Sequence, residues 1–440
     1  MKPLVAIVGR PNVGKSTLFN RIVGRRIAII EDTPGVTRDR IYGDAEWLTH
    51  SFTVIDTGGI EPDSTEIIPA QMRRQAELAI ETSDVIIFVV DGREGMTAAD
   101  SEVADMLRRS GKPIVLCVNK VDHVKYEDTA YDFYSLGLDA PITVSAEQGL
   151  GVGDLLDEVC RYFPAIEQED ESETVSIAVV GKPNVGKSSL VNALLGQERT
   201  IVSNIPGTTR DAIDTPFTYN GKDYVLIDTA GIRRKRAIVD ETVERYSVIR
   251  SLAAIRRCDV ALIVVDAEQG LSEQDVRIAG YVHEEGKASV LIVNKWDLIE
   301  KDTHTVEKFK KDITCDLAFM DYVPMLFISA KTGQRVHRVM EAANAVLEQA
   351  STRISTGILN DIMGEAITMS EPPSVKGRRL RIFYTTQGGV KPPTFIIFVN
   401  DAELMHFSYK RYLENYIRKS FKLDSVPIRL IIRNKSEKDN

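Results

Sequence analysis

GRPNVGKSTL begins at Gly9, and GKPNVGKSSL begins at Gly181. Each segment matches GxxxxGK[ST], a glycine loop whose main-chain N–H groups bind phosphates at the start of a helix. Each also follows a short apolar run, VAIVG or IAVVG, that is typical of a buried strand. One such match is a weak signal. Two matches in the same strand–loop–helix context predict two phosphate-binding domains in one chain.

Four further motifs occur twice and in the same order. They are PGVTRD and PGTTRD from Pro34 and Pro206, DTGGI and DTAGI from Asp56 and Asp228, NKVD and NKWD from Asn119 and Asn294, and SAE and SAK from Ser145 and Ser329. The two copies are 172 residues apart up to DxxG, 175 at NKxD and 184 at the Ser-Ala pair. This pattern indicates a duplicated domain rather than a solenoid.

The length of 440 residues predicts about three domains at roughly 150 residues each. We place the first from 1 to 163, an acidic linker from 164 to 174, the second from 175 to 351, and a third from 352 to 440. Four scattered cysteines without a CxxC pair argue against disulfides and zinc and favour a cytoplasmic location. No stretch reaches the ~20 apolar residues of a membrane span.

The fold expected for both repeats is α/β with a mostly parallel sheet. VIIFVVD and VALIVVD, with PIVLCVNK and SVLIVNK, are continuous apolar runs that alternate with helical patterns. The third region predicts a small α+β domain in the order helix, strand, strand, helix, strand. Its last helix, DAELMHFSYKRYLENYIRKSF, places Leu404, Phe407, Tyr412 and Tyr416 near one face.

Guanine nucleotides are the ligands that these motifs select together. Lys15 and Lys187 offer a charge to the β- and γ-phosphates. Asp122 and Asp297 can accept both N–H groups of the guanine edge, a donor pair that adenine lacks. The predicted nucleotide-binding residues of the first domain are Gly9, Arg10, Pro11, Asn12, Val13, Gly14, Lys15, Ser16, Thr17, Asp56, Thr57, Gly58, Gly59, Ile60, Asn119, Lys120, Asp122, Ser145 and Ala146.

The second domain repeats this set. Its predicted residues are Gly181, Lys182, Pro183, Asn184, Val185, Gly186, Lys187, Ser188, Ser189, Asp228, Thr229, Ala230, Gly231, Ile232, Asn294, Lys295, Asp297, Ser329 and Ala330. In both sets the asparagine of NKxD can bond guanine N7 and the loop, and the side-chain stem of the NKxD lysine can cover the base. The Ser-Ala pair can place a main-chain N–H on guanine O6.

Magnesium ligands follow from the same motifs. Ser16 and Ser188 offer hydroxyls, and Asp56 and Asp228 offer carboxylates at strand ends. Thr37 and Thr209 precede Arg-Asp in both copies and are predicted to order with the γ-phosphate; Thr33 and Thr208 are the alternatives. Ile60 and Ile232 occupy the position where many GTPases carry a water-orienting Gln, so intrinsic hydrolysis should be slow.

Two G domains followed by a small basic domain resemble the Der (EngA) family of bacterial ribosome-assembly GTPases. PNVGKS in both copies, PGTTRD, and KPPTFIIFVN followed by HFSYKRYLENYIRKSF carry the resemblance, which spans essentially the whole chain. It implies a KH-like third domain, association with the large ribosomal subunit, its rRNA and proteins, and potassium-stimulated hydrolysis. Asn12 and Asn184 would then hold K⁺ in the place of an arginine finger, although each Asn can also serve only the loop turn.

Net charge is uneven along the chain. Residues 352–440 hold 15 Lys and Arg against 9 Asp and Glu, a balance of +6, whereas the remainder holds 40 against 55, or −15. This indicates an anionic partner at one end, yet 352–440 contain no GXXG loop of the kind that KH domains use to clamp nucleic acid. The predicted RNA or partner patch comprises Arg233, Arg234, Lys235, Arg236, Arg378, Arg379, Lys410 and Arg411; a solvated face is the alternative.

The predicted function is therefore a monomeric, ribosome-associated GTP hydrolase that acts as a switch in biogenesis of the large subunit, with Mg²⁺ and K⁺ as cofactors and no membrane partner. A second hypothesis is a nucleotide-locked scaffold or RNA-binding adaptor in which one G domain hydrolyses little GTP. An ATPase is disfavoured by the two NKxD motifs, and a tRNA-modifying GTPase by the lack of room for a further domain.

Overall fold

A computed structural model describes residues 3–24, 42–48, 50–60, 68–122, 128–163, 174–196, 200–202, 214–227, 250–372, 374–375 and 378–434. The chain forms two compact units. One contains the first G domain, and the other contains most of the second G domain with the C-terminal domain. The acidic linker predicted from 164 to 174 lies outside the described residues except for its last position.

The first G domain is a six-stranded sheet in the order β2-β3-β1-β4-β5-β6, in which only the β2–β3 pair is antiparallel. Its elements are β1 (Leu4–Gly9), α1 (Lys15–Val23), β2 (Tyr42–Trp47), β3 (His50–Asp56), η1 (Thr57–Ile60), α2 (Ile68–Thr82), β4 (Val85–Asp91), α3 (Ala98–Arg109), β5 (Ile114–Asn119), η3 (Asp128–Leu136), β6 (Ile142–Thr143) and α4 (Val152–Arg161). Alternate β1 residues face opposite layers. Val5 and Ile7 pack with Leu18 of α1, whereas Ala6 and Val8 pack with residues of α2 and α3.

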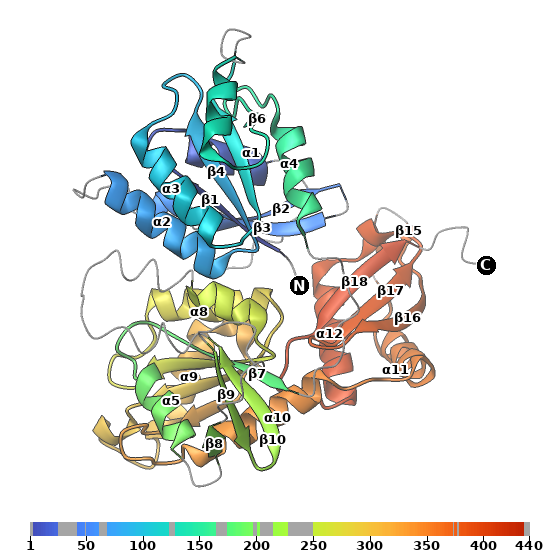
Figure 1. The fold of residues 1–440 in the computed structure, drawn as a ribbon. Coiled ribbons are helices and arrows are strands. Elements are labelled where there is room, and N and C mark those ends of the chain that lie inside the picture. The colour runs from blue at the N-terminus through green and yellow to red at the C-terminus, as the bar shows by residue number, and fades with distance from the viewer. Residues whose placement is uncertain are drawn as a thin grey trace. The chain divides into compact units, whose positions relative to one another are not determined.

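The second G domain repeats this plan in the described ranges, with sheet order β13-β12-β11-β7-β10-β9-β8 (Figure 1). Its elements are β7 (Val175–Val180), α5 (Lys187–Leu195), β8 (Thr200–Val202), β9 (Thr215–Tyr219), β10 (Lys222–Ile227), β11 (Val260–Asp266), α8 (Glu273–Glu284), β12 (Ala288–Asn294), η4 (Trp296–Leu298), α9 (Thr305–Asp316), η5 (Ala318–Met320), β13 (Met325–Phe327) and α10 (His337–Ala350). Strands β11 and β12 are buried along their whole length, as their unbroken apolar sequences predict. The expected α/β class is confirmed for both repeats.

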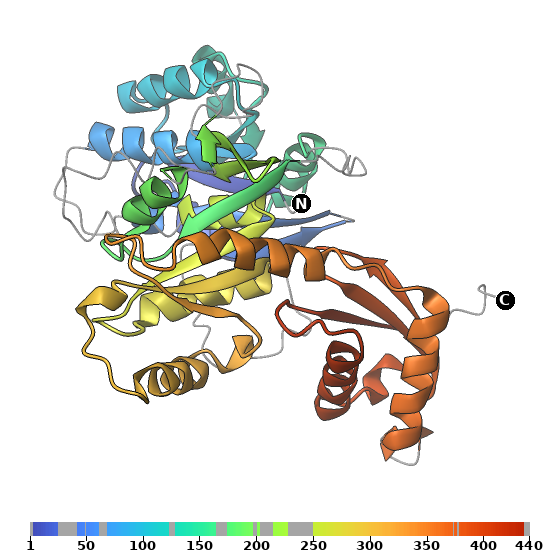
Figure 2. The ribbon, with the colours of Figure 1, turned by 90° about the horizontal axis from the view of Figure 1, so that it is seen from below.

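The C-terminal domain is α+β, as predicted. It contains α11 (Thr356–Met369), β14 (Ser374–Val375), β15 (Arg378–Arg379), β16 (Ile382–Gly389), β17 (Thr394–Val399), η6 (Ala402–Leu404), α12 (Phe407–Ser420) and β18 (Arg429–Asn434). Strand β17 is central, antiparallel to β16 and parallel to β18. Helices α11 and α12 cover one face of this sheet (Figure 2).

Two details of this domain differ from the sequence predictions. An additional short hairpin, which the predicted order did not include, precedes β16: Arg378 and Arg379 form β15 and pair with β14. Phe407 is 57% exposed and does not lie on the buried face of α12. That face is made by Tyr409, Leu413 and Ile417, which follow the spacing of four residues that the helix requires.

The C-terminal domain contacts the second G domain at the end of α8. Arg429 Nη2 donates to the main-chain oxygen of Glu284 at 3.2 Å. Lys391 Nζ lies 3.2 Å from the carboxylate of Asp259, which precedes β11. These contacts attach the start of β18 and the β16–β17 connection to the G domain. No helix within the described ranges is long and apolar enough to cross a membrane.

Candidate nucleotide-binding sites

The P-loop glycines allow close approach between two motifs that are distant in sequence. Gly14 and Gly186, with φ of 93° and 98°, directly precede α1 and α5. A Cβ at Gly14 would lie 2.3 Å from Asn119 Nδ2, and one at Gly186 would lie 2.2 Å from Asn294 Nδ2. A residue with a side chain would be strained there and would displace the NKxD asparagine.

The P-loop lysines are held by main-chain oxygens of their own loops. Lys15 Nζ donates to Gly9 O at 2.7 Å and to Arg10 O at 2.6 Å. Lys187 Nζ donates to Gly181 O and Lys182 O, both at 2.6 Å. Burial lowers the pKa of Lys15 from 10.5 to about 8, although the charge of Asp56 acts in the opposite direction. Lys15 is therefore a buried charge that loses its proton at a lower pH than an exposed lysine does.

Ser16 and Asp56, the two predicted magnesium ligands of the first site, lie together. Ser16 Oγ donates to Asp56 Oδ2 at 2.6 Å, and Asp56 is 1% exposed at the end of β3. A hydroxyl and a carboxylate oxygen at this separation are a donor set that suits Mg²⁺. Ser188 has the equivalent place at the start of α5. Its predicted partner, Asp228, lies outside the described residues.

The NKxD asparagines join three loops. Asn119 Nδ2 donates to Val13 O at 2.8 Å, and Asn119 Oδ1 accepts from Ala146 N at 3.0 Å. Asn294 makes the matching bonds to Val185 O at 2.8 Å and from Ala330 N at 2.9 Å. Each asparagine thus ties the P-loop to the Ser-Ala loop. A bond from the alanine N–H to guanine O6, as predicted, would have to share or replace this contact.

The NKxD lysines bind carboxylates that end the neighbouring strands. Lys120 Nζ lies 2.6 Å from Asp91 Oδ2, and Lys295 Nζ lies 2.6 Å from Asp266 Oδ2. Burial opposes ionisation of Asp91, but the bonds from Lys120 and from two backbone N–H groups outweigh it, so its pKa is lowered. Both lysines have positive φ, 68° and 62°, and the ion pairs hold the ends of their side chains.

The two base-selecting carboxylates have different partners. Asp122 pairs with Arg93. In the second copy the position of Arg93 is occupied by Glu268, and the hydrogen bond from Ser329 is the main cause of the lowered pKa of Asp297. Guanine entering the first site must therefore compete with an arginine, whereas in the second it competes with a hydroxyl.

Asn12 and Asn184 share one backbone conformation. Their φ angles are 65° and 66°, in the left-handed region where Asn is among the tolerated residues. This conformation accounts for Asn as a loop residue. The predicted role of its amide oxygen as a cation ligand is a separate requirement, which the φ angle does not test.

Several predicted residues lie outside the described ranges. They are Thr33, Thr37, Thr208, Thr209, Asp228, Thr229, Ala230, Gly231, Ile232, Arg233, Arg234, Lys235 and Arg236. Within the described part of the predicted patch, Arg378 pairs with Asp401 at 3.1 Å and Arg379 with Glu371 at 2.7 Å. Lys410 and Arg411 lie on α12.

Sequence reasoning missed the acidic residues that support these sites. Asp91 and Asp266 end matching strands, and Asp100 and Asp275 follow nine residues later in each copy. Each of these aspartates recurs 175 residues later, at the same offset as NKxD, and this recurrence could have identified them from the sequence. A strand-end or helix-start Asp is common as a turn or cap, so its contact with a lysine or arginine emerges only in three dimensions.

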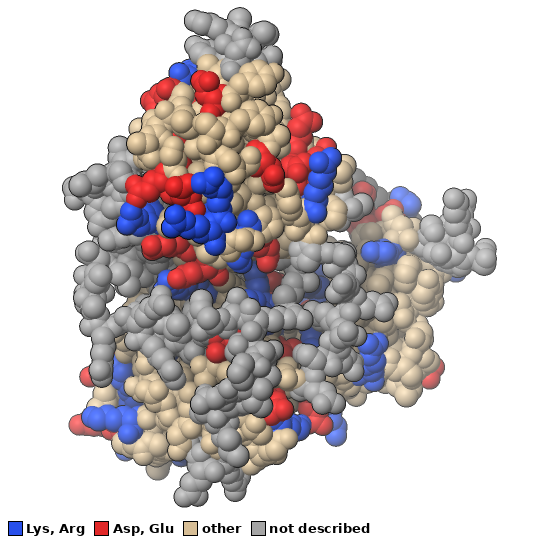
Figure 3. Space-filling view, viewed as in Figure 1, with Lys and Arg blue, Asp and Glu red and all other residues tan. Residues whose placement is uncertain are grey.

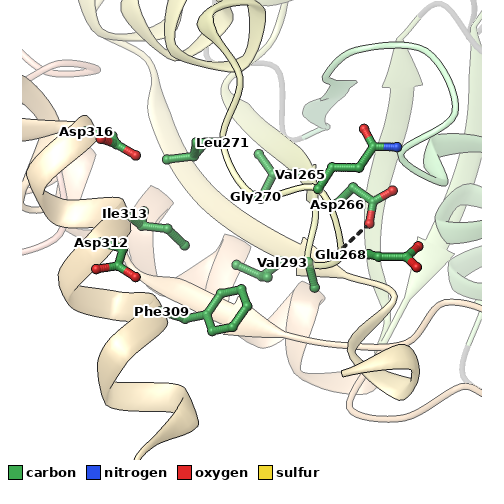
Figure 4. Close-up of a pocket in the computed structure, with 12 residues that line it drawn as sticks. Val265, Asp266, Glu268, Gly270, Leu271, Val293, Phe309, Asp312, Ile313 and Asp316 are labelled. Atoms are coloured by element: carbon green, nitrogen blue, oxygen red, sulfur yellow. Dashed lines mark hydrogen bonds between the residues drawn. The ribbon is translucent and has the colours of Figure 1, made fainter. Parts of the chain in front are cut away.

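A pocket of about 340 Å³ in the second G domain is a different site (Figure 4). Phe309, Ile313 and Leu271 line its apolar side, and Asp312 and Asp316 of α9 lie at its edge. None of the lining residues belongs to the P-loop, to NKWD or to Ser329-Ala330. The cavity adjoins the nucleotide site, because Asp266, which binds Lys295 of NKWD, also lines it.

Comparisons with known proteins identify similar families and relatives. The family described as "50S ribosome-binding GTPase" matches residues 4–120 and 176–295, and "KH-domain-like of EngA bacterial GTPase enzymes, C-terminal" matches 353–433. GTPase Der of Alkaliphilus metalliredigens is 58% identical, with 100% of both chains covered. GTPase Der of Ruminiclostridium cellulolyticum is 60% identical, also over 100% of both chains. A crystal structure of an Aquifex aeolicus Era variant with GDP and AlF₄⁻ is 20% identical over 60% of this chain and 95% of that chain, with a TM-score of 0.30.

Two P-loops on mostly parallel sheets, each completed by NKxD and Ser-Ala motifs, define a GTP hydrolase with tandem G domains. The C-terminal domain matched as KH-like completes the order expected above. The chain belongs to the Der (EngA) family of GTPases, as its full-length relatives show.

Asp297→Asn should change the base that the second site accepts. The amide of Asn donates a hydrogen bond where the carboxylate accepted one, so it matches the C2 carbonyl of xanthine instead of the amino group of guanine. We expect guanosine affinity at this site to fall on the order of 10⁴-fold. Titration with labelled GDP should then give one site per chain, and XDP should fill the other. Asp122→Asn is the matched control for the first site; two guanosine sites in either variant would contradict the assignment.

Guanosine binding to the first site should weaken above about pH 8. Bound phosphate favours charged Lys15, whose pKa is about 8. Binding therefore takes up a proton at higher pH, and affinity falls by up to about tenfold per pH unit. Labelled GDP can be titrated from pH 7 to 9 in the Asp297→Asn chain. Lys15→Arg stays charged and should flatten this slope; an equal slope would assign the titration to another group.

Proposed function

We propose that this GTPase is a nucleotide-dependent switch in biogenesis of the large ribosomal subunit. The main support is that one chain combines two P-loop sites with a basic C-terminal domain. The lysines of both P-loops make the same main-chain contacts, and the C-terminal domain has a charge balance of +6. The description of the family that matches both G domains names 50S ribosome binding, which supports this partner.

Mg²⁺ accompanies the nucleotide in GTPases, and the residues proposed to hold it here are Ser16 and Asp56 in the first site. Their oxygens already lie 2.6 Å apart. Ser188, Asp228, Thr37 and Thr209 complete the proposal by the repeat of their motifs. The ion would neutralise charge between the β- and γ-phosphates, while Lys15 and Lys187 act from the loop side.

Potassium is proposed to supply the positive charge that a finger arginine supplies in other GTPases. The support is Ile60 and Ile232 at the Gln position and an Asn at the same place in both P-loops. An ion held by Asn12 or Asn184 would lie beside the phosphates, where developing negative charge needs compensation.

The C-terminal domain is proposed to contact ribosomal RNA or a ribosomal protein. On the face in Figure 3 its Lys and Arg side chains are scattered among uncharged residues rather than joined in one continuous field. Arg418 has a packing role, because it donates to Leu423 O at 2.8 Å and Val426 O at 2.7 Å and lies over the Tyr322 ring. Arg378, Arg379, Lys410 and Arg411 remain the proposed contact residues.

Sedimentation with purified ribosomal subunits tests this function. We expect the protein to pellet with the large subunit in the presence of a non-hydrolysable GTP analogue and to be released with GDP. Equal binding to both subunits in both nucleotide states would contradict the proposal. Hydrolysis with no nucleotide-dependent association would leave a plain GTPase, and association without hydrolysis at one site would favour the scaffold hypothesis.

Charge neutralisation makes the same test residue-specific. Replacing Arg233, Arg234, Lys235 and Arg236 by Gln should weaken association with the ribosomal subunit. The slope of log K against log salt concentration should become less steep by about 0.7–0.9 for each phosphate contact that is lost. The comparison variant replaces Lys308, Lys310 and Lys311 of α9.

Single-turnover hydrolysis in K⁺ and in Na⁺ tests the cation role. Gly accepts the φ of 65° at Asn12 but has no amide oxygen. Asn12→Gly should therefore lower the rate in K⁺ toward that in Na⁺, by about 10²-fold. Asn184→Gly should do the same at the second site. A K⁺-to-Na⁺ ratio that is unchanged in both variants would show that Asn serves only the turn.

A further inference from the structure

The second residue of each P-loop occupies a variable position of the motif, yet both copies carry a base there. Arg10 Nε lies 3.0 Å from Asp100 Oδ1, and Lys182 Nζ lies 3.3 Å from Asp275 Oδ2. Both aspartate side chains are 0% exposed. A carboxylate so deeply buried is stable only when it is paired or hydrogen-bonded. The repeated pairing is therefore a constraint on both loops.

Each aspartate is fixed at its own helix. Asp100 Oδ2 accepts from Thr97 N at 3.0 Å and from Thr97 Oγ1 at 2.7 Å, which closes the capping box of α3. Asp275 Oδ2 accepts from Ser272 N at 3.0 Å and Ser272 Oγ at 2.6 Å at the start of α8. The carboxylate belongs to a rigid element, so the pairing fixes the loop residue relative to that helix.

The same loop residue also holds the P-loop lysine. Lys15 Nζ donates to the main-chain oxygen of Arg10, and Lys187 Nζ to that of Lys182, both at 2.6 Å. One residue thus bonds the capping aspartate through its side chain and the phosphate-binding lysine through its carbonyl. A shift of this residue would move the lysine and the loop N–H groups with it.

We propose that Asp100 and Asp275 are positioning residues for phosphate binding. They act through Arg10 and Lys182, and set the place of Lys15 and Lys187 before nucleotide arrives. Prior placement of this kind removes an ordering cost from binding, and small displacements of a phosphate-binding group are costly.

The basic residue of the P-loop has different carboxylate partners in the two copies. The guanidinium of Arg10 also pairs with Glu94, since Nη1 lies 2.9 Å from Oε2. In the second copy the position of Glu94 is occupied by Gln269. A planar guanidinium can bind two carboxylates, whereas an ammonium is a single point charge. The second site should therefore depend more strongly on its one aspartate.

Asp275→Asn tests the proposal in a chain that also carries Asp122→Asn. The first site then accepts xanthosine nucleotides, so labelled GDP reports on the second site. The amide oxygen still accepts the capping bonds, while the charge that holds Lys182 is lost. We expect the Kd for labelled GDP and the KM for GTP to rise by about ten- to a hundredfold, with a smaller change in kcat. Asp100→Asn, assayed in the Asp297→Asn chain, should give a smaller rise because Glu94 remains.

Ser272→Ala separates positioning from helix capping. It removes the capping hydroxyl and keeps the carboxylate, so the melting temperature should fall while the Kd stays near that of the unsubstituted chain. If Ser272→Ala raises the Kd as much as Asp275→Asn does, capping is the cause and the proposal is overturned. A lower melting temperature with an unchanged Kd in Asp275→Asn would overturn it as well.

A gain-of-contact variant keeps the test valid if Asp275→Asn does not fold. Lys182→Arg with Gln269→Glu transplants the arrangement of the first P-loop into the second. We expect a lower Kd for GDP at the second site of this double variant. An unaltered Kd would overturn the proposal.

Discussion

A positive charge held by main-chain oxygens behind each phosphate loop is the constraint on which the sites depend. Lys15 is 6% exposed, and its contacts with Gly9 O and Arg10 O, together with the charge of Asp56, offset its burial. The loop must therefore keep those carbonyls turned inward, which leaves its N–H groups to face outward. Phosphate then meets a loop whose polarity is already arranged.

Both repeats hold the P-loop with the same main-chain contacts, but the side chains around these contacts differ. The asparagine bridge between the P-loop and the Ser-Ala loop has the same partners in both copies. By contrast, Asp122 faces Arg93 in the first copy, and Glu268 takes that position in the second. The backbone cradle is thus common to both sites, whereas the electrostatics at the base edge differ.

Helix α8 connects two parts of the second unit. Its first turn holds Asp275, which pairs with Lys182 of the P-loop, and its last residue, Glu284, accepts a hydrogen bond from Arg429 of the C-terminal domain. A helix is stiff over this length, so both contacts are made by one rigid element. The described residues thus place the phosphate loop and the start of β18 at opposite ends of α8.

The sequence by itself determined the duplicated α/β domains, the P-loop lysines and the guanine motifs, because each depends on local glycine chemistry and on apolar periodicity, which are read along the chain. It also gave the order of the α+β domain, although Phe407 was misplaced on α12, because helical phase near a terminus depends on where the helix begins. Only the tertiary structure decided that Asp100 and Asp275 hold the P-loops and that Lys120 and Lys295 bind strand-end carboxylates. Such pairs join residues far apart in sequence, and whether two charges meet depends on how parallel strands and their following loops converge at one edge of a sheet.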